Sequence, residues 1–209
     1  MDKFNKIKNI IFPSKKINFL VIIILFLGIV SGAVFMNIIN LNDRNLVIDK
    51  IQMFISNIDK QNINSLLVFK NSVFINLLYS VLLWVLGFTI VGVLVNIFIL
   101  YMKGFVFGFS LASFIVTYGY KGIILSVLYT FLGQLLNLLV VMMLSIYSIM
   151  FTINLFKQIF KNGHSINILK FFKNYSLIFI ITIIISLVSS ISETFIFPVF
   201  IKIIIKLFI

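Results

Sequence analysis

The chain has 209 residues, 62% of them hydrophobic and only 11% charged, with a formal net charge of +12 at pH 7. Soluble domains are roughly 45–50% apolar and about 25% charged, so the composition excludes an ordinary soluble protein, whose polar residues must cover most of its surface. The absence of Cys excludes disulfides, thiolate metal sites and thiol catalysis.

The basic residues stand in short clusters between apolar runs. They are not arranged on one basic face with interleaved aromatic residues, so the pattern does not indicate a nucleic-acid partner. Clusters of this kind set the orientation of membrane helices and contact anionic lipid headgroups. We therefore predict an all-α, polytopic integral membrane helical bundle, with the lipid bilayer as its surroundings.

A basic tail at residues 1–17 precedes the first apolar run, residues 18–39. The run has roughly the 20 residues that a membrane-spanning helix needs. Ser31-Gly32-Ala33 resembles a signal-peptidase site, but the apolar core of a secretory signal is only about 7–15 residues long. We therefore favour an uncleaved first transmembrane helix over a signal peptide.

Residues 40–72 are polar and carry an amphipathic helical pattern. Apolar residues recur there at helical spacing, at Val47, Ile51, Phe54, Ile55 and Ile58. Amphipathicity does not distinguish a helix on the membrane surface from a docking face for a partner protein. We favour the membrane surface and keep the docking face as the functional hypothesis for this extracytoplasmic segment.

The apolar runs 73–102 and 104–120 are separated by Lys103. As one straight helix the first would be about 45 Å long, against a hydrocarbon core of roughly 30 Å. It is predicted either to tilt and protrude or to break near Gly87. The second is predicted to cross the membrane. A re-entrant loop there would leave four crossings and place the basic loop at 157–174 outside, which the positive-inside rule disfavours.

The second half of the chain supplies two further spans. Residues 122–156 form another overlong run, and the last span is predicted at 175–197, before a C-terminal tail at 198–209. The loop 157–174 between them is basic. Five crossings follow, and because Lys is densest in this loop and in the N-terminal tail, we predict an N-inside, C-outside orientation.

Few polar residues fall inside the predicted spans. Gln134 and Asn137 lie three residues apart and so share a helix face; we favour interhelical hydrogen bonding, with a permeation pathway as the alternative. Glu193, the only Glu, is either buried and functional or exposed at the outer interface. Pro198 is expected to kink or end its helix.

Small residues recur every four positions in two of the predicted spans. This pattern lets helices approach closely and predicts packing more safely than dimerisation, so self-association is left open. The residues are Gly28, Gly32, Gly104, Gly108 and Ala112.

The sequence offers no candidate catalytic centre. His164, the only His, lies in a polar loop without a second His, a Cys or a nearby carboxylate, so neither a metal shell nor a catalytic triad can be assembled around it. Membrane-embedded protease motifs are absent as well. We predict a protein that is not an enzyme, with no metal and no cofactor.

The order and spacing of several apolar motifs resemble the stage II sporulation protein M family, from about Gly28 to Pro198. The motifs are LWVLG at 83–87, MKGFVFGF at 102–109, YKG at 120–122 and ISETFIFP at 191–198. In the fourth span the chain departs from the family's Pro-Gln-Asn stretch and keeps only Gln134.

The resemblance implies an integral membrane anchor of endospore engulfment. Such a protein would stand in the mother-cell membrane at the septum and recruit two peptidoglycan-remodelling partners, stage II sporulation proteins D and P. The alternative is a permease or channel-like transport component, which the two overlong segments and the polar residues of the spans favour.

Overall fold

The computed structural model describes residues 14–59, 64–128, 134–160 and 168–208. Within these ranges the chain is helical almost throughout, without a β-strand. Five segments are long and apolar enough to cross a membrane. They are α2 (Lys15–Ile38), α4 (Ser65–Leu86), α5 (Ile90–Tyr118), α7 (Leu135–Phe160) and a last segment built on α8 (Ile168–Ile191). The predicted all-α bundle with five long apolar segments is confirmed.

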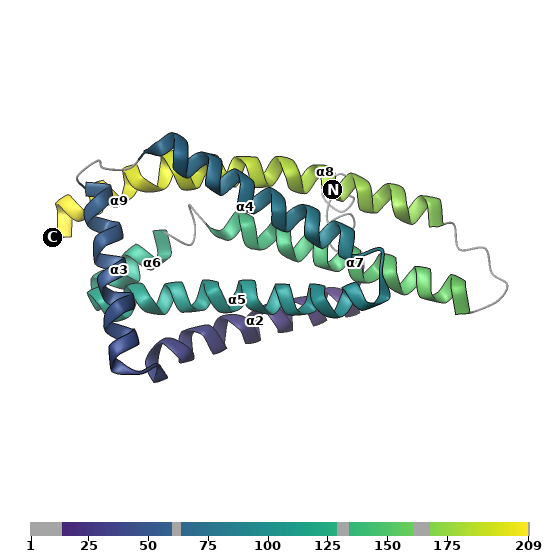
Figure 1. The fold of residues 1–209 in the computed structure, drawn as a ribbon, viewed down its shortest axis with the longest axis horizontal. Helices are drawn as coiled ribbons and strands as arrows, with labels where there is room; N and C mark the ends of the chain where they lie inside the picture. Colours follow the sequence, from purple (N-terminus) through teal and green to yellow (C-terminus); the bar gives the residue numbers. More distant parts are fainter. Residues whose placement is uncertain (1–13, 60–63, 129–133, 161–167, 209) are drawn as a thin grey trace, which may run out of the picture.

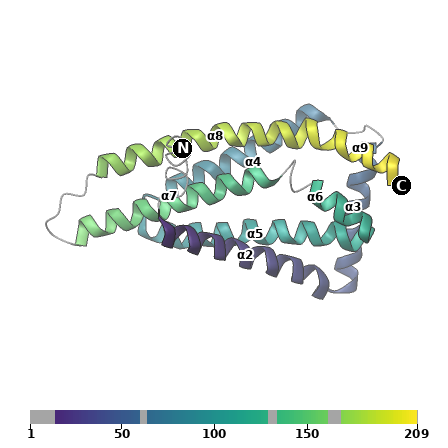
Figure 2. The ribbon, with the colours of Figure 1, turned by 180° about the vertical axis from the view of Figure 1, so that it is seen from behind.

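The long helices lie along one common direction (Figures 1 and 2). One end of the bundle, which we call the basic end, holds the start of α2, the α4–α5 turn, the end of α7 and the start of α8. The opposite cap end carries α3 (Leu41–Asp59), α6 (Tyr120–Leu128) and α9 (Phe197–Phe208). The helix α3 runs across the end of the bundle instead of along it (Figure 1). The predicted tail up to residue 13 and His164 lie outside the described residues.

The expected division at Lys103 is wrong. The chain turns at Gly87, α4 ends at Leu86, and α5 continues unbroken through Lys103. Gly87 is buried where a Cβ would collide with the Tyr175 hydroxyl. Beyond the turn, Thr89 caps α5 by accepting a hydrogen bond from the Gly92 N–H at 3.0 Å. The overlong run at 73–102 is therefore broken, and its second part joins the run at 104–120.

The polar segment also ends earlier than expected, because α4 begins at Ser65. Asn64 caps this helix by accepting a hydrogen bond from the Leu67 N–H at 3.2 Å. In the second half, Gly119 has a φ of 60° and separates α5 from α6. The overlong run at 122–156 thus contributes to two helices, α6 and α7, separated by residues 129–133, which lie outside the described residues.

Two apolar clusters stabilise the bundle. The larger lies along α7 and packs it against α4, α5 and α8; among its fully buried members are Leu83, Leu100, Leu144 and Tyr175. The smaller lies at the cap end and joins α3 to α5, α6 and α9 through Ile55, Ile58, Phe114, Leu125, Phe197 and Ile201. The cap helices are therefore packed onto the bundle by apolar contacts.

Candidate functional site

The carboxylate of Glu193 is a meeting point for three other side chains. Ser72 Oγ, on α4, donates a hydrogen bond to its Oε2 at 2.5 Å. Gln134 Nε2, from the residue before α7, and Asn137 Nδ2, from its first turn, donate to Oε1 at 3.2 and 2.6 Å. The two residues that spacing places on one helix face therefore both reach the same carboxylate, and the bonds are interhelical.

Hydrogen bonds continue from this carboxylate along the interface of α4 and α8. Asn76 Nδ2 donates to Ser72 Oγ at 3.3 Å and to Ser190 Oγ at 3.0 Å. One turn further, the hydroxyls of Ser80 and Ser186 lie 3.3 Å apart. We call this set the polar seam. Its members are Ser72, Asn76, Ser80, Gln134, Asn137, Ser186, Ser190 and Glu193.

Lys103 brings a second charge into the interior. It lies near the middle of α5, where its Nζ is 3.6 Å from the centre of the Tyr79 ring of α4. A lysine over an aromatic face gains about 2 kcal/mol or more once it is removed from water. The contact with the aromatic ring therefore helps α5 to continue through this position.

The local backbone explains how Glu193 comes to lie at the seam. Residues Ser192–Ile196 form a π-helical turn, η2, in which the Phe197 N–H donates to the Ser192 carbonyl. Pro198 follows directly and has no N–H to continue the α-helical pattern. In the first turn of α9 that missing donor is tolerated. The helix therefore widens into a π turn before Pro198 and then continues as α9. The π turn carries Glu193, the one acidic residue of the described spans. Such π turns occur frequently at functional sites.

The seam is well suited to holding helices together in lipid. Hydrogen bonds to a charged group contribute about 1.5–3 kcal/mol each, and no water is available in a bilayer core to replace them. Three donors on one carboxylate, from α4 and α7, also satisfy most of its acceptor sites. The geometry indicates that these bonds hold the α8–α9 junction in place in the bundle, more directly than it indicates an open path for a solute.

The glycines occupy a different interface, between α2 and α5. A Cβ on Gly32 would overlap the Phe105 carbonyl, and one on Gly108 would overlap the Ile29 carbonyl. Gly28 and Gly104 face each other in the same contact, and Ala112 extends the buried stripe. The two backbones touch along this line, so the stripes serve packing within one chain.

The five candidate docking residues divide into two groups. Ile55 and Ile58 are buried against α5, α6 and α9, so they hold α3 in place. Phe54 stacks on Phe197, with ring centroids 6.3 Å apart. Val47 and Ile51, by contrast, line an open groove between α3 and α5. Both are half-buried there, and Ile51 also packs against the cluster of Ile55 and Ile58, whereas Phe54 remains 39% exposed.

Sequence reasoning missed Ser72, Asn76 and Lys103 as members of the interior. A signal for the first two existed, because Ser72, Asn76 and Ser80 repeat every four residues and so share one face of α4. The boundary predicted between 72 and 73 concealed it, because it separated Ser72 from Asn76 and Ser80. For Lys103 the sequence holds no comparable signal, since its ring partner lies on another helix.

Five long apolar helices, held together by hydrogen bonds between polar side chains and by close glycine contacts, define a polytopic helical membrane protein. Residues 21–198 match the family described as Stage II sporulation protein M. The chain belongs to this family and is a sporulation membrane protein, as the motif order predicts. No curated protein and no solved structure matches the chain.

Proposed function

We propose that the chain is a non-enzymatic membrane anchor for the peptidoglycan-remodelling complex of engulfment. Its partners are stage II sporulation proteins D and P, and its place is the mother-cell membrane at the septum and around the engulfed forespore. The observation that carries the proposal is the family match, which extends over nearly the whole bundle, from residue 21 to residue 198. In the predicted N-inside, C-outside orientation, the cap end would lie on the side of the cell wall, where such partners act.

The cap end offers a specific surface for a partner. Val47 and Ile51 line a groove of about 350 Å³ together with Leu46, Lys50 and Phe109 of α5. Leu46 is 61% exposed. An exposed apolar strip with a charged rim is typical of a protein-interaction site. The groove is therefore where we expect a partner segment to dock.

Recovery of the tagged chain from sporulating cells in mild detergent tests this proposal. The wild-type chain is expected to bring down both partners. The double variant Leu46→Glu/Val47→Glu places two carboxylates in the groove and should release them, while membrane fractionation shows normal insertion. Asn57→Glu is the matched control, because Asn57 is exposed on the same helix outside the groove. Unchanged recovery of both partners by the double variant would contradict the proposed docking site.

A second candidate function, transport, is favoured by one observation. Gln134, Asn137 and Glu193 converge between the helices, and a second ionisable side chain, Lys103, lies on α5 against the Tyr79 ring. Ionisable groups inside a membrane protein are often part of an ion or proton path. Proteoliposomes with ion gradients test this: a flux that Glu193→Gln abolishes would support transport, and membranes that stay silent under several ionic conditions would support the anchor.

A further inference from the structure

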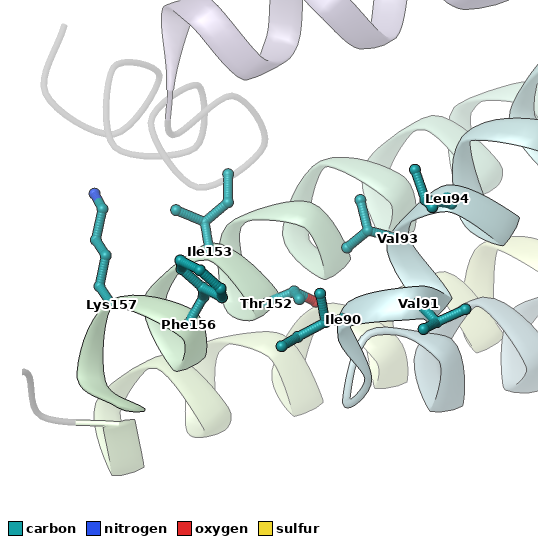
Figure 3. A pocket seen from close by; sticks show the side chains of 8 residues that line it. All are labelled: Ile90, Val91, Val93, Leu94, Thr152, Ile153, Phe156 and Lys157. Atoms are coloured by element: carbon teal, nitrogen blue, oxygen red, sulfur yellow. The ribbon is translucent and has the colours of Figure 1, made fainter. Parts of the chain in front are cut away.

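A groove at the basic end lies between the start of α5 and the end of α7. It has a volume of about 540 Å³ and is lined by Ile90, Val91, Val93, Leu94, Thr152, Ile153, Phe156 and Lys157. Figure 3 shows the apolar side chains in a row, with Lys157 at one end and its amino group pointing away from them. The groove thus combines an apolar floor with a single cation at its mouth.

Apart from Lys157, the described side chains that line the groove have no polar group free for a ligand. The only hydroxyl among them, on Thr152, already donates to the Gly87 carbonyl at 2.7 Å. A peptide in extended form would bury its amides there without partners, at a cost of about 1–3 kcal/mol for each. Val91 and Leu94 are each 70% exposed, on a helix that is apolar enough to face lipid. A hydrocarbon chain is the occupant that such a floor fits.

The mouth of the groove selects for negative charge. Lys157 is exposed there, and the helix α5 begins at Ile90 with the positive end of its dipole. Lys15, Lys16 and Lys173 are at the same end of the bundle, whereas the acids of the described chain are in α3 and η2 at or near the cap end. A headgroup in the groove therefore meets the Lys157 ammonium and no described carboxylate.

We propose that this groove is a binding site for an anionic phospholipid. The first methylene groups of an acyl chain pack against Val91, Leu94 and Ile153, and the phosphate pairs with the Lys157 ammonium. A second apolar groove of about 500 Å³, along α4, provides an internal comparison, because its lining residues run from Phe74 to Leu86 and include no charged side chain. That groove should accept lipid without preference for the headgroup.

Native mass spectrometry of the purified chain, with dioleoyl-phosphatidylglycerol or dioleoyl-phosphatidylcholine added, tests the site. The anionic lipid should bind about fivefold more tightly, the factor that corresponds to about 1 kcal/mol per basic residue at an anionic surface. Lys157→Gln should bring the ratio close to one. Lys70→Gln, at an exposed lysine of α4, should leave the ratio unchanged.

Two further variants test whether an acyl chain occupies the groove. Leu94→Trp fills the proposed groove and should remove the tightly bound anionic lipid, whereas Leu78→Trp fills the uncharged groove and should retain it. A photoactivatable acyl chain on phosphatidylglycerol should cross-link to residues 90–94 and 152–157, a result that requires no variant to fold. An unchanged ratio in Lys157→Gln, cross-links spread over the whole bundle, or a partner helix recovered in the groove would each overturn the proposal.

Discussion

The α2–α5 interface and the polar seam hold the same bundle together by opposite means. Between α2 and α5, glycines bring two backbones into direct contact, and a Cβ on Gly32 or Gly108 would overlap a carbonyl of the facing helix. In the seam, helices are linked through side chains that converge on Glu193. Lipid removes the hydrophobic driving force between helices, so close packing and hydrogen bonding are the two means that remain.

The difference predicts how each interface responds to change. A packed backbone contact has no room and no alternative partner, so any added side chain must separate the helices. In the seam three donors share one carboxylate, so the cluster is expected to lose its strength in steps. The packed interface should therefore fail abruptly and the seam gradually.

Gly32→Leu is expected to have the largest effect. Overpacking a filled site costs about 1–3 kcal/mol and more where the backbone cannot move, and here the obstacle is the backbone of α5. We expect a loss of more than about 3 kcal/mol in the free energy of unfolding, measured by denaturant titration in mixed micelles. Val34→Leu is the control, since Val34 is 51% exposed on the same helix. A variant at Gly32 as stable as this control would show that the interface is not tightly packed.

Glu193→Ala should rank second. It removes the acceptor shared by Ser72, Gln134 and Asn137, and a hydrogen bond to a charged group contributes about 1.5–3 kcal/mol. Because the donors can partly re-pair and the cost of burying the charge disappears, a net loss of about 2 kcal/mol is expected in the same titration. Glu193→Gln keeps one acceptor oxygen and should lose less. A Glu193→Ala variant as stable as the wild type would show that the cluster does not depend on the carboxylate.

The two interfaces also differ in how far sequence predicts them. The glycine stripes are visible as a spacing of four, and their role in packing follows from it. The pairing of Gln134 with Asn137 is visible for the same reason. What spacing cannot supply is the partner: nothing local links Asn137 to Glu193, 56 positions away.

The helix boundaries show a related limit. Lys103 was expected to end a span because a charge in lipid is costly, yet the Tyr79 ring keeps it inside α5. Gly87 was a candidate break because the apolar run 73–102 is too long for one straight span, and the chain does turn there. A boundary can be predicted where the chain itself supplies the signal, as a glycine or a cap does. It is missed where a distant side chain removes the penalty.

Asn137→Leu sharpens the comparison within the seam. Asn137 makes the shorter of the two bonds to Glu193 Oε1, at 2.6 Å, so its loss should cost about 1.5 kcal/mol. In a Glu193→Gln background the same change should cost clearly less, because the charge that strengthens the bond is gone. A double-mutant cycle measures this coupling directly. If the losses of the two single variants simply add up in the double variant, Asn137 and Glu193 do not stabilise each other.

Ser80→Ala should have the smallest effect of the series. The Ser80 hydroxyl already donates to the Asn76 carbonyl of its own helix at 2.9 Å, and its contact with Ser186 on α8 is a long 3.3 Å. Hydrogen bonds between membrane helices average about 0.6 kcal/mol, and a methyl group fits where the hydroxyl lay. We expect a change of about 0.5 kcal/mol or less, against more than about 3 kcal/mol for Gly32→Leu. If Ser80→Ala were as damaging as the glycine change, the seam would have to be a rigid unit like the α2–α5 contact. A graded series from Glu193 through Asn137 to Ser80 would instead show that its strength is concentrated at the carboxylate.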